Sequence, residues 1–285
     1  LTLETDFTRY SATSDSIQRL NNFFLQPNFT YRGENFRVKV GANIASSDDV
    51  FSLFPDLEVG ANVISGILNI FAGANGDLNK NNFRSLAAYN PYIQSSIDIR
   101  NTRFFNYYVG AKGNIQGINY RGEVGYKAAE DLALYLDVPN DPDRFRVLYD
   151  DVNVTYIKGT VEADIQGFKF TGVLTQNFYD PTEEEKVWHL PALELNIGAQ
   201  YTTLEDKLQV KGELYIENGV PFVNREGEAD NLNGLFDVSV GAEYYFTEKF
   251  GGFVNIYNLA NNRRERWFRY PTFGLNALAG ISVRF

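Results

Sequence analysis

The segment FGLNALAGISVRF, residues 273–285, decides the fold, because large apolar residues alternate with small or polar ones along its whole length. One face carries Phe273, Leu275, Ala277, Ala279, Ile281, Val283 and Phe285. A period of two is that of a β-strand. A tilted strand needs about ten residues to cross a bilayer, whereas strands of soluble sheets average about five or six. The segment predicts a membrane-crossing strand, with the last strand of a large soluble barrel as the alternative.

The same alternation recurs along the rest of the chain, joined by connections that are alternately short and long. Strands are predicted at Leu1–Ala12, Phe23–Arg32, Phe36–Ile44, Leu57–Val63, Gly66–Ala74, Ile97–Ile115, Ile118–Ala128, Arg144–Ile165, Phe168–Tyr179, Leu193–Thr203, Leu208–Glu217, Phe236–Phe246, Phe250–Asn258 and Phe273–Phe285. Tight turns are predicted at Gly33-Glu34, Ser65, Gln116-Gly117, Gln166-Gly167, Glu205-Asp206 and Thr247-Glu248-Lys249. All of these turns fall at the same end of the sheet.

An even strand number, with short turns at one end and long loops at the other, is typical of bacterial outer-membrane proteins. We predict an all-β fold, an antiparallel transmembrane β-barrel of about 14 strands that forms a single outer-membrane domain over residues 1–285. The alternative is a soluble β-sandwich or a lipocalin-like fold, which is usually built from a shorter chain. A change of apolar parity near Asp150 and Asp151 predicts a β-bulge there.

The position of the last strand sets the expected orientation. If it ends in the periplasm, the short turns are periplasmic and the long loops, including the one at Asp48-Asp49, are extracellular. We also expect this strand to close the barrel by pairing with both Phe250–Asn258 and the first strand.

The composition excludes several classes of function. The absence of cysteine excludes disulfides, thiolate zinc sites and cysteine nucleophiles. A net charge of −10 repels phosphate backbones, so no nucleic-acid partner is expected. The chain has no apolar run of eighteen residues and no signal-peptide pattern at Leu1, so we expect a mature chain. A mean hydropathy of −0.29 does not decide the class, because alternating strands average out.

Charged residues of the strands are expected on the face opposite the apolar one, where they could neutralise one another across neighbouring strands. The candidates for lining the lumen are Arg37, Lys39, Asp56, Glu58, Lys112, Arg121, Glu123, Lys211, Glu213, Asp237 and Glu243. We expect Arg37 and Lys39 to neutralise Asp56 and Glu58. We also expect Lys211 and Glu213 to form pairs with Asp237 and Glu243. Such a lining fits either a stiffened, closed interior or a polar pore, and the sequence leaves both open.

Two stretches resemble TonB-dependent receptors. NIYNLANNRRERWFRYPTFGLNALAGISVRF, residues 255–285, resembles the last two strands of such receptors, and NPYIQSSIDIRNTRFFNYYVGAKGNI, residues 90–115, resembles their mid-barrel region. The richness in Asn and Tyr is similar to barrels of the Bacteroidota. Receptors of this family have a plug and a larger barrel of about 22 strands. The sequence departs from both, so energised import is not implied, and we expect either a shortened, plugless relative or a piece of a longer protein.

Candidates for catalysis and metal binding are few. The single histidine, His189, is a possible general base of a barrel hydrolase, but packing beside Trp188 is the simpler interpretation. Calcium could bind acid clusters, although none has the spacing of a defined calcium loop. These clusters are Asp137, Asn140, Asp141 and Asp143; Asp150 and Asp151; and Glu183, Glu184 and Glu185. No nucleotide or cofactor motif is present, so neither a metal nor a cofactor is expected.

The long loops carry the candidates for contact with partners. They are Trp188, Arg263, Arg264, Arg266 and Trp267. The arginines, with Arg269, could bind lipid headgroups, lipopolysaccharide sugars or a protein, or could pair with loop acids. We therefore predict a non-enzymatic, porin- or receptor-like barrel for passage or uptake of small solutes. The alternative is a structural or accessory subunit of a larger complex of outer-membrane or periplasmic proteins.

Overall fold

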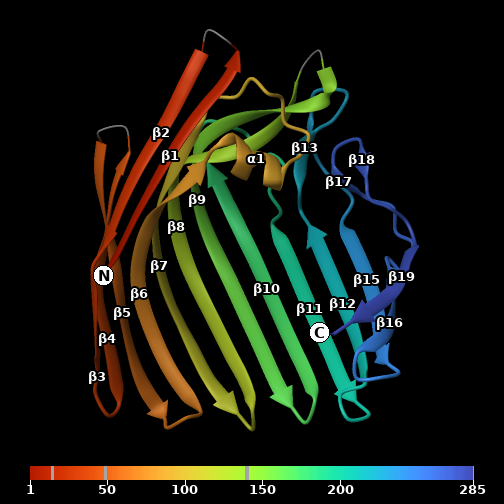
Figure 1. Ribbon diagram of the computed structural model, residues 1–285. Helices are drawn as coiled ribbons and strands as arrows, with labels where there is room; N and C mark the ends of the chain where they lie inside the picture. Colours follow the sequence, from red (N-terminus) through yellow and green to blue (C-terminus); the bar gives the residue numbers. More distant parts are fainter. Residues whose placement is uncertain (14–15, 48–49, 139–140, 285) are drawn as a thin grey trace.

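The computed structural model describes residues 1–13, 16–47, 50–138 and 141–284. Predictions on Asp48, Asp49, Asn140 and Phe285 lie outside the described residues. The chain forms one large antiparallel sheet, whose order follows the sequence from β1 to β19 (Figure 1). Its path comprises β1 (Thr2–Thr13), β2 (Ser16–Gln26), β4 (Phe36–Ser47), β5 (Val50–Ile64), β6 (Leu68–Asn81), β7 (Arg100–Ile115), β8 (Ile118–Val138), β9 (Asp141–Ile165), β10 (Phe168–Pro181), β11 (Leu193–Thr203), β12 (Leu208–Asn218), β15 (Leu235–Tyr245), β16 (Phe250–Tyr257) and β19 (Asn276–Val283).

Smaller elements lie off this path. β3 (Asn28–Arg32) follows β2 after Pro27 and pairs with the same neighbour, β4. The connections contain α1 (Phe83–Tyr89) and two small hairpins, β13 (Pro221–Val223) with β14 (Ala229–Asn231), and β17 (Glu265–Trp267) with β18 (Tyr270–Pro271). In the part of the chain that is described, no helix is long and apolar enough to cross a membrane.

The predicted tight turns all lie at one end of the sheet, the turn end, at the bottom of Figure 1. Gln116 and Gly117 have φ angles of 53° and 88°, and Gln166 and Gly167 have 50° and 80°. Two consecutive positive φ values are those of a type I′ turn, whose twist matches that of the flanking strands. The fourteen-strand antiparallel architecture predicted from the sequence is confirmed.

The two faces of the sheet differ as predicted. One face exposes large apolar side chains, among them Phe7, Phe51 and Ile281, which are 76% to 77% exposed. The opposite, polar face is the concave one, because its side chains reach across intervening strands. Glu58 of β5 contacts Lys112 of β7, and Ser282 of β19 donates to Glu243 of β15. An apolar convex face and a polar concave face are the arrangement of a membrane barrel.

The long central hairpin corrects a sequence prediction. A loop was expected between Ala128 and Arg144, yet β8 continues to Val138 and β9 begins at Asp141. The bulge lies on β8, where the register with β9 shifts between Ala129 and Leu132, opposite Asp151. The extra residue turns the side chains of β8 beyond Leu132 to the other face. On β9 the apolar pattern changes near Asp150 because both of its faces are covered there: Tyr149 packs in one apolar cluster and Leu148 in another.

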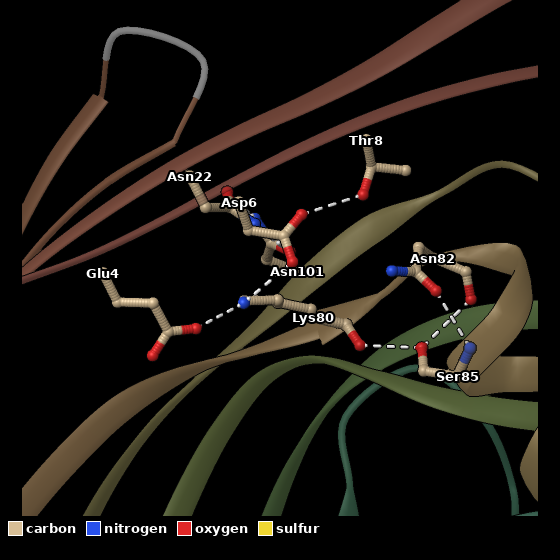
Figure 2. Close-up of polar contacts among 8 residues, drawn as sticks. All are labelled: Glu4, Asp6, Thr8, Asn22, Lys80, Asn82, Ser85 and Asn101. Atoms are coloured by element: carbon tan, nitrogen blue, oxygen red, sulfur yellow. Dashed lines mark hydrogen bonds and ion pairs between the residues drawn. The ribbon is translucent and has the colours of Figure 1, made fainter.

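The predicted closure of the barrel is wrong for the described residues, in which β19 pairs with β16 and β1 pairs with β2. The contacts of β1 supply a physical reason. Lys80 of β6 contacts Glu4 at 2.8 Å and Asp6 at 2.9 Å, and Thr8 donates to Asp6 (Figure 2). Lys80 is seven residues after Gly73 in an unbroken strand, so its side chain lies on the convex face of β6. These bonds hold β1 against that face, and away from β19.

β2 is held in the same way. Asn101 at the start of β7 donates to Asn22 at 2.8 Å and to Ser47 of β4 at 2.8 Å. The β5–β6 ladder stops at the pair Asp56–Asn75, so the two strands separate beyond it. The parts of β1, β2 and β6 near the end that carries the long loops, called the loop end below, are thereby packed together.

Candidate functional site

Two regions hold the functional candidates: the charged residues of the polar face and the packed loops at the loop end. On β4 and β5 the predicted pairing is partly found. Lys39 Nζ lies 2.6 Å from Asp56 Oδ2. Glu58, the cross-strand neighbour of Lys39, instead contacts Lys112 Nζ at 3.4 Å and accepts from Tyr108 Oη at 3.2 Å. The polar face is thus tied together along the strands and across them.

The contact from β5 to β7 depends on a glycine in the strand between them. A Cβ on Gly73 would lie 2.5 Å from Cζ of Tyr108 and 2.7 Å from the Leu57 carbonyl oxygen. Only a residue without a side chain leaves room for the Tyr108 ring to pass over β6. Gly73 thereby permits the hydrogen bond between Tyr108 and Glu58.

A second charged group lies on β8. Arg121 donates from Nε and Nη2 to Glu123 Oε2, at 2.9 and 2.7 Å. Its guanidinium lies 4.1 Å from the centroid of Phe71, a ring that Lys112 Nζ also approaches at 4.8 Å. A cation over an aromatic face is favourable, so Phe71 separates two positive charges and stabilises both. These four residues form one continuous polar surface with the Glu58 group.

The predicted pairing in the C-terminal half is wrong. Lys211 and Glu213 form no ion pair with Asp237 or Glu243, all of which are described residues. Asp237 accepts from Ser239 at 2.7 Å. Glu243 accepts from Ser282 and from Tyr245 at 3.1 Å. Hydroxyl donors on the same strand, or two strands away, satisfy these carboxylates, which pairing rules applied to a single sequence do not anticipate. Arg37 also differs from its prediction, because its buried Nε has no partner among the described residues.

At the loop end, segments far apart in sequence form one apolar core. Its buried members are Leu20, Leu86, Ile93, Ile97, Ile99, Ala133, Tyr135, Phe145 and Trp267. Leu20 lies on β2, near one edge of the sheet, and Trp267 lies between β16 and β19, at the other edge. The core therefore spans the loop end from one sheet edge to the other. We call these residues the loop core.

The Trp267 ring is the centre of this core. Its centroid lies 5.4 Å from those of Tyr89, Tyr135 and His189, and 5.6 Å from that of Phe145. Aromatic pairs at such separations add to the stabilisation gained by burying their apolar area. The β17–β18 hairpin is thus anchored on α1, on the β8–β9 extension and on the loop that carries His189.

His189 is a buried packing residue, with 2% of its surface exposed. Nδ1 lies 2.8 Å from the Tyr135 carbonyl, an acceptor, so this nitrogen carries the proton. Burial lowers the pKa of His189 to about 4, the Tyr135 carbonyl opposes that shift, and the charge of Arg266 adds to it. The imidazole is therefore neutral at physiological pH and enclosed, which agrees with the packing interpretation.

The loop arginine and tryptophans differ from the predicted partner surface. Arg266 forms an ion pair with Glu217, whose carboxylate also accepts from Tyr215 Oη and is 1% exposed. Trp188 and Trp267 are each 4% exposed, and Trp188 Nε1 donates to Glu184 at 2.7 Å. All three side chains are used within the loops. Arg263 and Arg264 are exposed, and their contact with a partner remains a prediction.

Asp150 and Asp151, two of the predicted acidic residues, have structural partners. Asp150 accepts from the backbone N–H groups of Glu183 and Glu184, at 3.0 and 2.9 Å, and Asp151 accepts from that of Asp131. These carboxylates fasten the loop after β10 to the bulged hairpin. Across the described ranges, no group of three or more acidic or histidine side chains is placed to hold a metal ion.

Comparison with known proteins finds similarity to solved structures only. No protein-family model matches the chain, and no curated protein matches it. Solved structures do: the ferric-catecholate import receptor Fiu of E. coli K12 has a TM-score of 0.69 at 10% identity, over 99% of this chain and 50% of that one. The siderophore receptor PirA of Acinetobacter baumannii has a TM-score of 0.64 at 11% identity, over 94% and 46%.

The ferripyoverdine receptor of the outer membrane of Pseudomonas aeruginosa has a TM-score of 0.64 at 13% identity, over 94% of this chain and 40% of that one. These neighbours are TonB-dependent outer-membrane receptors. The chain spans half or less of the length of these three structures. At these identities the likeness is one of fold, and the fold is that of outer-membrane β-barrel receptors.

Proposed function

We propose that the chain forms the wall of an outer-membrane barrel that takes up small solutes, with its short turns in the periplasm and its long loops outside. The observation that carries this proposal is the contrast between the two faces of the sheet. The convex face exposes apolar side chains along every strand, which suits lipid. The concave face carries ion pairs and hydrogen-bonded carboxylates, which suit water or a polar solute.

The sheet edges bear on how the barrel is completed. β1 and β19 each have one strand neighbour within the described ranges. Backbone N–H and C=O groups without partners are strongly disfavoured in lipid. The proposal therefore requires further strands beside β1 and β19, in the same polypeptide or in a partner, and these would make the barrel larger than fourteen strands.

The neighbours in fold support an uptake role. They include a copper transporter and an iron transporter, in addition to the siderophore receptors. Arg263 and Arg264 are proposed to contact lipopolysaccharide or anionic headgroups at the loop end. A second candidate function, as a structural subunit of a larger outer-membrane complex, is favoured by the two sheet edges, because strand addition is a common way for chains to associate.

Cysteine labelling tests the proposal directly, since the chain contains no native cysteine. Glu213→Cys places a thiol on the polar face of β12, and Val210→Cys places one on the apolar face of the same strand. In protein reconstituted into lipid, a membrane-impermeant maleimide is expected to label only the first variant. Equal labelling of both would contradict the assignment of the faces.

Conductance then separates the two functions. For an uptake barrel, planar-bilayer recordings should detect ion passage, and bulky maleimide adducts at position 213 should reduce it. A structural subunit would show the same labelling pattern but no conductance, even in a variant such as Trp267→Ala that loosens the loop core.

A further inference from the structure

A cavity on the concave face has features that neither the ion pairs nor the loop core explains. It has a volume of about 470 Å³ and lies against strands β6 to β10. At the loop end it is bounded by Leu132, just beyond the bulge, and by Leu190 of the loop after β10. Both residues also pack in the apolar cluster around Trp188. The cavity is therefore a pocket on the concave face that the packed loops bound at one end, and its size suits a small molecule.

Two lysines give the cavity an unbalanced positive charge. Lys127 of β8 and Lys158 of β9 line it, and neither ammonium lies within ion-pair distance of a carboxylate of the described residues. Glu123 also lines the cavity, but its carboxylate is already bound by Arg121 at 2.7 Å. Lys127 Nζ rests over the Phe104 ring, 5.2 Å from its centroid. In a chain with net charge −10, two unpaired ammonium groups on one wall attract an anion.

A buried amide supplies a second, independent sign of a ligand. Asn106 of β7 is 9% exposed, and its Nδ2 donates to Asn75 Oδ1 at 3.0 Å. Its Oδ1 is buried and accepts no hydrogen bond from the described residues. Leaving a buried acceptor without a donor is costly, so such a group is usually satisfied by a water or another bound molecule. The missing group is a hydroxyl or N–H donor.

The shape of the cavity depends on Gly125. A Cβ at that position would lie 2.4 Å from Cζ of Tyr156, so the glycine lets the tyrosine ring lie flat against β8. Tyr156 then forms part of the wall between the two lysines, next to Asn106. Aromatic faces beside a few placed polar and charged groups are typical of small-molecule sites.

We infer that this cavity binds a small anionic solute that also carries hydroxyl or N–H donors, such as an acidic or phosphorylated sugar. Lys127 and Lys158 would bind the acid group, and Asn106 would accept a hydrogen bond from the remainder of the molecule. The inference rests on the proposed uptake function, because it names the class of solute that would be taken up. Binding of that solute can still be measured without measuring its transport.

Calorimetric titration of the purified protein in detergent tests the inference. Glucuronate and glucose 6-phosphate are the anionic probes, one with a carboxylate and one with a phosphate, and glucose is the neutral match. We expect saturable binding of at least one anion and none of glucose. The double variant Lys127→Gln, Lys158→Gln should lose at least tenfold in affinity, and the variant Lys127→Arg, Lys158→Arg should retain binding because it keeps both charges.

Lys169→Gln is the matched control, because Lys169 lies on the same face but near the turn end, where it contacts Asp164 at 3.7 Å. Its affinity should equal that of the unmodified protein. Equal binding of glucose and the anions, no saturable binding, or unchanged affinity in the folded double glutamine variant would each overturn the inference. Conductance without binding would leave the uptake proposal standing, whereas binding without conductance would leave the site standing and overturn uptake.

Discussion

Arg266 of the β17–β18 hairpin forms an ion pair with Glu217 at the end of β12, and that carboxylate is almost completely buried. Removing one member of a buried pair costs about 3–5 kcal/mol, because the other charge is left without its counter-ion. Arg266→Gln is therefore expected to release the hairpin. Protease cleavage within residues 258–275, or faster amide exchange there, measures this effect.

The double variant Arg266→Gln, Glu217→Gln is the control for that prediction. With both charges removed, no buried ion is stranded, and the hairpin should recover most of its protection. If the double variant is as exposed to protease as Arg266→Gln alone, the pair does not hold the hairpin.

The loop core should weaken in acid because of His189. Its pKa falls from 6.5 in the unfolded chain to about 4 in the folded one, so between these values the unfolded state binds more protons. The stability linked to His189 is complete above pH 6.5 and is lost as the pH falls toward 4, by roughly 3 kcal/mol in total. Amide exchange of residues 182–192 measured from pH 7 to 4 should show this loss.

A variant without the titrating group isolates the effect. His189→Gln should have lower protection at pH 7, because packing with Trp267 is lost, but a flatter pH dependence than the natural chain. A pH dependence equal to that of the natural chain would assign the acid sensitivity to other groups.

The sequence predicts the sheet well because its signal is local. Strands with one apolar and one polar face keep a period of two, and the Gln116-Gly117 and Gln166-Gly167 turns are marked by residues that accept positive φ. The signal fails where both faces are covered. Beyond the bulge on β8, Leu134 packs with Trp188 on one face and Tyr135 with Trp267 on the other, so polar alternation disappears and a loop was predicted.

The candidate site is less predictable because it depends on distant contacts. That Glu58 would accept a hydrogen bond from Tyr108 follows from strand order and from the absence of a side chain at Gly73, neither of which is visible in a local pattern. The burial of Trp267 depends on the docking of a hairpin onto strands more than one hundred residues earlier. The sequence could not show that Lys127 lacks an ion pair, because that depends on which partner each nearby carboxylate has in the folded chain.

Gly73→Ala tests the contact across β6. The added methyl group would overlap the Tyr108 ring and the Leu57 carbonyl, so the strand must shift or the tyrosine must leave Glu58. Overpacking of this kind costs about 1–3 kcal/mol. Thermal unfolding followed by β-sheet circular dichroism measures the change. Gly122→Ala is the control, since a Cβ there meets no atom within 4 Å, and it should be neutral or slightly stabilising.

Trp267→Ala tests whether the loop core obstructs the proposed pathway. The ring is 4% exposed and contacts Tyr89, Tyr135, Phe145 and His189, so its loss leaves a cavity at the centre of the core and costs about 3–5 kcal/mol. The β17–β18 hairpin and α1 should then lose their common anchor, while the ladders of β10 to β12, which lie outside the core, should keep their amide protection.

Because the loop core spans the loop end between the two sheet edges, its loosening in Trp267→Ala should increase conductance in reconstituted protein. Tyr244→Ala is the matched control, because it removes an aromatic ring that is exposed and lies near the turn end. This variant should leave conductance unchanged. An unchanged conductance in Trp267→Ala, with the hairpin shown to be released, would mean that the packed loops do not lie in the path of the solute.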